Sequence, residues 1–275
     1  MSTTLLLAGG GALAGVFGAL LGLGGGILIV PLLTLAFGLP FREAVAVSLV
    51  AVITSSSASA AVYLERHVAN LRLGMTLELF TAIGAVLGGL AAFVLPDRLL
   101  AGLFAVMLAY TAWTMVRRRA STAEPARLPA EPQPSWRDGF VAGISGPGYR
   151  VRRLPAGIGL SFVAGIVSAL LGVGGGIVKV PAMNLVMGVP LRVATATSNM
   201  MIGVTGSASA ILYLLRGDVN AFVAGPVVLG VFAGATVTSR LAHRVPVATV
   251  RLAFVVVLLY VAVEMGMRAM GIGGG

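Results

Sequence analysis

Apolar residues run along this chain in long continuous blocks, separated by short polar or glycine- and proline-containing stretches. The first half contains four such blocks, at about residues 4–38, 44–64, 73–95 and 99–116. The last three blocks each have a length that suits one helical crossing of a hydrocarbon core about 30 Å thick. The pattern therefore predicts a bundle of membrane-spanning helices.

The first block is too long for a single crossing. As one helix, its 35 residues would extend about 50 Å at 1.5 Å per residue. The glycine-rich stretch at residues 21–26 also interrupts the block near its middle. We therefore expect a hairpin, either with two full crossings or as a re-entrant pair of half-helices. In both cases the chain returns to the side on which it began.

The second half repeats the first at a constant offset of 150 residues. Residues 15–115 and 165–265 align without a gap and are identical at 37 of 101 positions. The segment ALLGLGGGILIVP (19–31) matches ALLGVGGGIVKVP (169–181). Shared membrane composition cannot produce one register over that length, so the chain is a duplication and the hairpin recurs at 156–190.

A basic, proline-containing stretch separates the two copies. We divide the chain into a first membrane repeat (1–116), a solvated cytoplasmic linker (117–153) and a second membrane repeat (154–275). A hairpin plus three crossings ends on the opposite side, so successive copies face opposite ways. With the linker in the cytoplasm, inverted repeats place 14 arginines inside and 4 outside, whereas parallel repeats place 12 and 6. The positive-inside rule favours the inverted arrangement, with both termini extracytoplasmic.

Composition agrees with a multi-pass protein of the cell inner (plasma) membrane. Of 275 residues, 58% are hydrophobic and 10% are charged, against about 25% charged in an average soluble domain. The net charge of +10 does not indicate nucleic-acid binding, because eight of the 18 arginines fall in the linker. The expected fold is all-α, with two inverted repeats, each a glycine-broken helical hairpin plus three transmembrane helices.

Inverted repeats with glycine-interrupted segments at corresponding positions are typical of secondary transporters, whose site lies near the midplane between the repeats. Two glycine triplets occupy the predicted hairpin tips: Gly24, Gly25, Gly26, and Gly174, Gly175, Gly176. Each triplet opens a half-helix, where free backbone N–H groups favour an anion. Close packing of helices would also require glycine, so both interpretations of the triplets stay open.

Other candidate substrate contacts are polar residues in apolar surroundings. Lys179 is the only lysine, and its repeat mate is Ile29. A buried ammonium in a membrane is costly and tends to mark a site, so Lys179 is predicted to be a counter-charge for an anion; the alternative is a side chain that reaches the surface. Ser48 and Ser198 recur where each polar helix begins, and Asn199 is an amide with no amide counterpart.

Carboxylates within apolar blocks are limited to Glu78 and Glu264. Glu78 is a candidate for proton coupling, against the alternative that it is solvated near a helix end. No paired acids and no nucleophile–base arrangement indicate an enzyme, and the lack of cysteine excludes thiolate chemistry. No cofactor or metal is expected. The expected partners are a small anion and the lipid bilayer, without nucleic acid, and formation of a homo-oligomer is left open.

The duplicated GxGGGxxxVP element, followed by a glycine–proline turn and a helix of small polar residues, resembles the TauE/SafE sulfite-exporter family. The likeness covers nearly the whole chain except the linker. It implies a permease for sulfite, organosulfonates such as sulfoacetate, or related sulfur anions. The predicted function is a secondary transporter that moves a small anion by alternating access, and the alternative is an anion channel of the same architecture.

Overall fold

The computed structural model describes residues 2–21, 24–65, 68–117, 139–146, 148–241 and 247–272. These residues form helices and connecting turns, and no β-strand occurs among them. In this part of the chain, seven helices are long and apolar enough to cross a membrane. The all-α membrane fold class is confirmed.

The helices follow the predicted blocks closely. The first repeat consists of α1 (Ser2–Leu21), α2 (Gly26–Pro31), the π-helical turn η1 (Leu32–Ala36), α3 (Phe41–Glu65), α4 (Leu71–Val94) and α5 (Asp97–Arg117). A short helix, α6 (Gly139–Ile144), precedes the second repeat. That repeat consists of α7 (Leu154–Leu171), α8 (Gly176–Pro181), the π-helical turn η3 (Ala182–Val186), α9 (Leu191–Arg216), α10 (Ala221–Leu241) and α11 (Val247–Ala269).

Each hairpin has a long first arm and a short second arm. The short arms, Gly26–Ala36 and Gly176–Val186, are each eleven residues long. At 1.5 Å per residue they extend about 16 Å, half of a hydrocarbon core about 30 Å thick. Pro31 and Pro181 end the α-helical part of each arm, where the missing N–H suits the change to a π turn. The second arm of each hairpin is therefore a half-helix.

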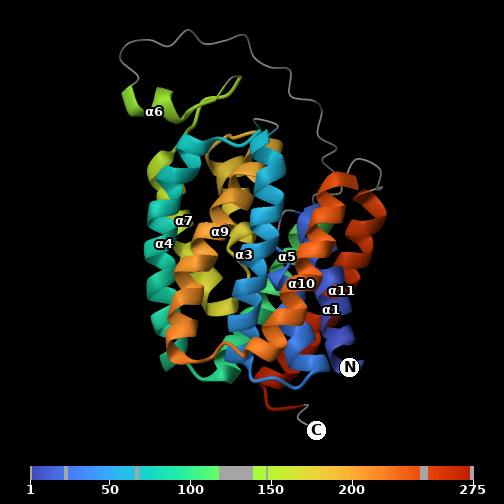
Figure 1. Ribbon diagram of the computed structural model, residues 1–275. Coiled ribbons are helices and arrows are strands. Elements are labelled where there is room, and N and C mark those ends of the chain that lie inside the picture. Colours follow the sequence, from blue (N-terminus) through green and yellow to red (C-terminus); the bar gives the residue numbers. More distant parts are fainter. Residues whose placement is uncertain are drawn as a thin grey trace.

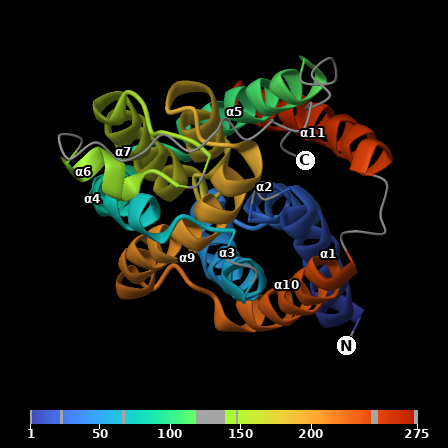
Figure 2. The same ribbon diagram turned by 90° about the horizontal axis from the view of Figure 1, so that it is seen from above.

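Helices of one repeat pack mainly on helices of the other. α1 packs on α10, while α7, the repeat mate of α1, packs on α4. The mates α3 and α9 pack on each other, as do α5 and α11. Figures 1 and 2 show α3 and α9 between the α4–α7 pair and the α1–α10 pair. Each contact between two helices is thus repeated between their mates, which is the pattern that a two-fold relation between the repeats produces.

Corresponding helices run in opposite directions along the bundle. In Figure 1, α3 rises from the lower to the upper end, whereas α9 descends, and both termini lie toward the lower end. These directions are those expected of inverted repeats. The placement of the repeats across a membrane stays a prediction.

The last part of the predicted linker folds onto the helices. Ile144 is 2% exposed and Val151 is 3% exposed, and both belong to a core cluster that includes Leu73 and Met187. The backbone N–H of Arg152 donates to the Met187 carbonyl oxygen at 3.0 Å. The sequence assigned these residues to a solvated connector because arginine and proline dominate the stretch. The two buried apolar residues explain why its end is instead attached to the bundle.

Large apolar side chains cover the outer faces of the bundle. Leu79 on α4, Val106 on α5 and Leu229 on α10 are all exposed. A soluble protein rarely shows such extended apolar surface, whereas a hydrocarbon environment requires it. The outer surface therefore fits a lipid-facing one.

Candidate functional site

The two hairpin tips meet the same pair of side chains inside the bundle. A Cβ added to Gly24 would approach Val52 at 3.3 Å and Ile202 at 3.4 Å, and one on Gly174 would approach the same two residues at 2.8 and 2.7 Å. Val52 and Ile202 are repeat mates that lie near the middles of α3 and α9. The tips therefore come together at mid-depth, between the two central helices.

Direct contacts join the two tips. The Ser48 hydroxyl donates to the Gly172 carbonyl oxygen at 2.7 Å, and a Cβ on Gly26 would lie 2.3 Å from that same oxygen. The Ser55 hydroxyl donates to the Gly24 carbonyl oxygen at 2.8 Å. Ser48 thus holds the tip of the opposite repeat, and a side chain at Gly26 would separate the tips.

The conformation of the tips requires glycine. Gly24 and Gly25 have φ angles of 79° and 76°, and Gly174 and Gly175 have φ angles of 80° and 73°. This left-handed region is unfavourable for residues with a Cβ. Gly25 and Gly175 cap α2 and α8, whose first residues are Gly26 and Gly176. The triplets therefore have a structural cause, and their role in binding remains a prediction.

Two polar residues of α9 lie buried three and four residues before Ile202, which both tips approach. Asn199 is 2% exposed and Ser198 is fully buried. Among the described residues, Asn199 Nδ2 and Ser198 Oγ have no hydrogen-bond partner. An unpaired buried amide is costly, so Asn199 Nδ2 is a donor available to a ligand oxygen.

Lys179 is buried against polar groups from two other helices. Its Nζ donates to Thr205 Oγ1 of α9 at 2.6 Å and to Glu78 Oε2 of α4 at 3.2 Å. The Thr205 hydroxyl lies 2.5 Å from Glu78 Oε1, to which it donates. Lys179 is 1% exposed and Glu78 is 7% exposed. The ammonium does not reach the surface, and the interpretation of Glu78 as a solvated helix-end residue is wrong.

A signal for this ion pair was present in the sequence. Lys179 is the only lysine, and Glu78 is one of two carboxylates within apolar blocks. Because a buried charge needs a partner, the two belong together. The sequence alone did not show that Lys179 and Glu78 pair, because they are 101 residues apart and lie on different repeats. Thr205 carried no signal that set it apart from the other hydroxyls of α9.

A second amide, in the second hairpin, has a structural role. Asn184 in η3 donates through Nδ2 to the Val189 carbonyl oxygen at 2.9 Å. This bond closes the turn between the half-helix and α9. Asn184 is therefore satisfied within the protein, in contrast to Asn199.

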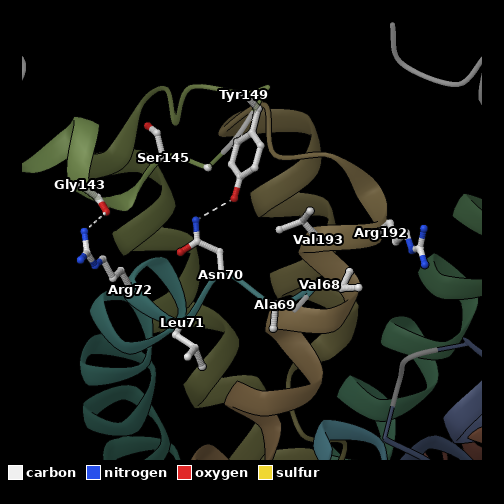
Figure 3. Close-up of a pocket in the computed structure, with 11 residues that line it drawn as sticks. Val68, Ala69, Asn70, Leu71, Arg72, Gly143, Ser145, Tyr149, Arg192 and Val193 are labelled. Carbon is white, nitrogen blue, oxygen red and sulfur yellow. Dashed lines mark hydrogen bonds between the residues drawn. The ribbon is translucent and has the colours of Figure 1, made fainter. Parts of the chain in front are cut away.

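A pocket of about 640 Å³ opens at the end of the bundle next to α6 (Figure 3). Asn70 caps α4 and donates through Nδ2 to Tyr149 Oη at 2.7 Å and to the Ile144 carbonyl oxygen at 2.8 Å. Burial raises the pKa of the Tyr149 phenol, so the ring stays neutral at physiological pH. Arg72 and Arg192 lie on opposite sides of the pocket (Figure 3). This end of the bundle therefore presents positive charge around an opening.

Comparison with known proteins identifies relatives along most of the chain. The sequence model of the sulfite exporter TauE/SafE family matches residues 7–265. "Probable membrane transporter protein YunE" of Bacillus subtilis (strain 168) is 24% identical over 269 residues, which cover 93% of this chain and 94% of that protein. "Probable membrane transporter protein YdhB" of the same organism is 23% identical over 235 residues, or 85% and 88% of the two chains.

A third relative matches a shorter part. "Probable membrane transporter protein ORF9" of Sinorhizobium sp is 35% identical over 109 residues, which cover 39% of this chain and 41% of that protein. No solved structure matches the chain.

Proposed function

Because the chain belongs to the TauE/SafE sulfite exporter family, we propose that it is a secondary transporter that moves a small sulfur anion, such as sulfite or an organosulfonate, across the plasma membrane. The family and the seven candidate spans make it a multi-pass membrane transporter. The proposal concerns the identity of the anion, the transport mechanism and the residues that bind the anion.

The observation that carries the proposal is the meeting of the two hairpin tips at mid-depth beside buried donors. An anion in a dry site needs hydrogen-bond donors and positive charge. Asn199 Nδ2 is a buried donor without a partner among the described residues, and Lys179 is a buried cation. Both lie on segments that contact the tips, α9 and α8. These groups are the donors that an oxyanion requires.

The proposed site combines main-chain and side-chain contacts. The tip glycines contribute backbone N–H groups at the starts of the two half-helices, Asn199 donates to an anion oxygen, and Lys179 supplies the counter-charge. Ser48 positions the tip of the opposite repeat, and the Ser198 hydroxyl, which has no partner among the described residues, is a further donor for the anion. Because the tips belong to different repeats, a rocking of one repeat against the other would open the site to each side in turn.

Transport assays with purified protein in proteoliposomes test this function. We expect saturable uptake of labelled sulfite or sulfoacetate and counterflow, in which internal unlabelled anion drives uptake of labelled anion. Sulfate, thiosulfate and taurine define the selectivity, and glycerol is the uncharged control. Conduction without counterflow would favour a channel of this architecture. The absence of both uptake and binding for every sulfur anion tested would contradict the proposal.

Two amide variants separate binding from folding. Asn199→Leu introduces the residue present at its repeat mate, Leu49, and Asn184→Thr introduces the mate Thr34. We expect Asn199→Leu to weaken anion binding about tenfold or more, equivalent to about 1.4 kcal/mol, without lowering the melting temperature. Asn184→Thr should lower the melting temperature and leave affinity unchanged. Equal affinities in wild type and Asn199→Leu would remove Asn199 from the site.

A further inference from the structure

Because the chain is duplicated, the buried ion pair has an equivalent place in the bundle, formed by the repeat mates of its two residues. At the offset of 150 residues, Ile29 corresponds to Lys179 and Val228 corresponds to Glu78. Ile29 is fully buried, so the fold accepts aliphatic side chains at the equivalent place. A buried ion pair is commonly no more stable than apolar residues of similar size. Folding therefore does not explain why one of the two equivalent places carries charged residues.

Thr205 can satisfy Glu78 in both of its protonation states. When the carboxylate is charged, the Thr205 hydroxyl donates to Glu78 Oε1 at 2.5 Å. When Glu78 is protonated, its O–H can donate to Thr205 Oγ1, whose own proton then goes to the Met201 carbonyl oxygen at 3.0 Å. A hydroxyl both donates and accepts, so the carboxyl can change charge without leaving a buried group unpaired.

The ammonium lies next to the tip of the second hairpin. Lys179 is in the last turn of α8, and a Cβ on Gly175 would lie 3.4 Å from Lys179 Cε. Of its three N–H donors, two have acceptors among the described residues, Thr205 and Glu78. A donor thus remains for an oxygen of an anion that enters at the tip.

The pocket at the α6 end and Glu78 lie at different depths along α4. Asn70 lines the pocket, and Glu78 lies eight residues further, or about 12 Å deeper at 1.5 Å per residue. Gly74 lies between them, and a Cβ there would come 2.7 Å from Met200 Cε and 3.0 Å from Thr197 Cγ2. Met200 is therefore one of the side chains that pack on α4 between these two depths, and methionine adapts its shape readily.

Lys179 is the charged group that faces Glu78. In the described chain, the packed elements α6 and α7 contain no titratable side chain, and α8 contains Lys179 alone. On α9, the titratable residues Arg192, Tyr213 and Arg216 lie toward its two ends. On α4 itself, Arg72 lines the pocket.

We propose that the Lys179–Glu78 pair couples anion transport to protons: a substrate anion replaces the Glu78 carboxylate at the Lys179 ammonium, and Glu78 binds one proton. This inference rests on the proposed transport of a sulfur anion. It explains by proton coupling why charged residues occupy one of the two equivalent places and apolar residues occupy the other.

The exchange balances charge and protons at each step. In the empty carrier, the Glu78 carboxylate pairs with the Lys179 ammonium. When the anion binds, an oxygen of the anion takes the place of the carboxylate, and Glu78 takes a proton from water on the open side. On release at the other side, Glu78 returns that proton to water and pairs with Lys179 again. One proton crosses with each anion, in the same direction.

Proteoliposomes with the membrane potential held at zero test the coupling. The probe is labelled sulfoacetate, which is fully ionised near neutral pH, and an internal dye reports proton entry. With the exterior one pH unit more acidic, wild-type protein should accumulate sulfoacetate up to about tenfold, because one coupled proton contributes a factor of ten per pH unit. Proton entry should accompany uptake.

Variants of Glu78 test whether this residue carries the coupled proton. Glu78→Gln removes the carboxylate that competes for Lys179, so sulfoacetate should bind more tightly near neutral pH, with no pH dependence and no accumulation in the acid gradient. Glu264→Gln is the matched control, because it makes the same substitution at a carboxylate of α11, and it should keep the accumulation. Should Glu78→Gln fail to fold, the sulfoacetate affinity of wild-type protein measured from pH 5 to pH 8 tests the same step: the affinity should rise as the pH falls, because Glu78 must bind a proton when the anion binds, and an affinity independent of pH would overturn the coupling.

The outcomes distinguish this inference from the function on which it rests. Wild-type uptake without proton entry, or acid-driven accumulation by Glu78→Gln, would overturn the coupling and leave anion transport standing. Failure of wild-type protein to bind or take up sulfoacetate, sulfite and thiosulfate would overturn both.

Discussion

At Lys179 the cost of burying an ammonium in an apolar block is offset by a carboxylate and a hydroxyl from two other helices. The sequence shows an aliphatic mate, Ile29, and on that ground alone isoleucine should be accepted at residue 179. The structure adds Glu78, which would remain buried and unpaired if lysine alone were removed. The two positions must therefore be changed together.

We expect Lys179→Ile alone to lower stability by about 3–5 kcal/mol, the usual effect of leaving one member of a buried pair uncompensated. The double variant with Glu78→Val should recover most of this loss. Thermal melting of the purified proteins in one detergent measures both effects. A single variant as stable as wild type would mean that Glu78 is neutral in the native state and that the pair holds no charge.

Because the Gly172 carbonyl oxygen lies so close to Gly26, a single methyl group added at residue 26 should have a large effect on stability and transport. A Cβ there would lie 2.3 Å from the Gly172 carbonyl oxygen, and backbone cannot move aside cheaply. Gly26→Ala should lower the melting temperature and abolish transport. Gly159→Ala is the matched control, because Gly159 lies within α7 and, apart from its chain neighbours and the backbone of its own helix, no atom lies within 4 Å of an added Cβ; it should be neutral or stabilising by up to about 1 kcal/mol. Equal behaviour of the two variants would contradict the contact between the tips.

At the scale of elements, the half-helices depend on contacts from elsewhere in the chain. Each changes from α- to π-helical geometry after a proline, and such a change leaves carbonyl groups without their usual partners. The guanidinium of Arg268, at the end of α11, donates to the Thr34 carbonyl oxygen at 2.9 Å. In the second repeat, Asn184 makes the corresponding stabilising contact with Val189. The same element is thus completed by different residues in the two repeats.

The segment that contains α6 should open when its main hydrogen bonds are lost. Asn70 caps α4 and bonds to both Ile144 and Tyr149, so Asn70→Ala should destabilise by about 1–2 kcal/mol. Hydrogen exchange of residues 139–153 should then increase. Tyr149→Phe removes one of these bonds and should have a smaller effect on exchange. Unchanged exchange in Asn70→Ala would show that apolar packing of Ile144 and Val151 alone holds the segment.

For the whole molecule, inverted repeats make a definite prediction of topology. A reporter fused at residue 130 should be cytoplasmic, and reporters at the N-terminus and C-terminus should both be extracytoplasmic. The reason is the split of 14 arginines against 4 together with the return of each hairpin to its starting side. A reporter at residue 130 found outside, or a C-terminus found inside, would contradict the inverted arrangement.

Much of the fold could be predicted from the sequence because hydrophobic length and duplication are properties of the chain itself. The blocks at 44–64, 73–95 and 99–116 correspond within a few residues to α3, α4 and α5. The choice between a full crossing and a half-helix was open, because periodicity does not show where a proline-containing arm changes to a π turn. The ordered end of the linker was missed because burial of Ile144 and Val151 depends on distant partners.

The membrane class, the two copies, the glycine breaks and the single lysine all follow from residue order or composition alone. Which side chains meet depends on how the helices pack in three dimensions. This packing brought Glu78 of one repeat to Lys179 of the other, set Ser48 on the opposite tip, and left the amide of Asn199 without a partner among the described residues. These two contacts follow from the interlocking of the repeats, because Ser48 and Glu78 each find a partner in the other copy, more than a hundred residues away along the chain.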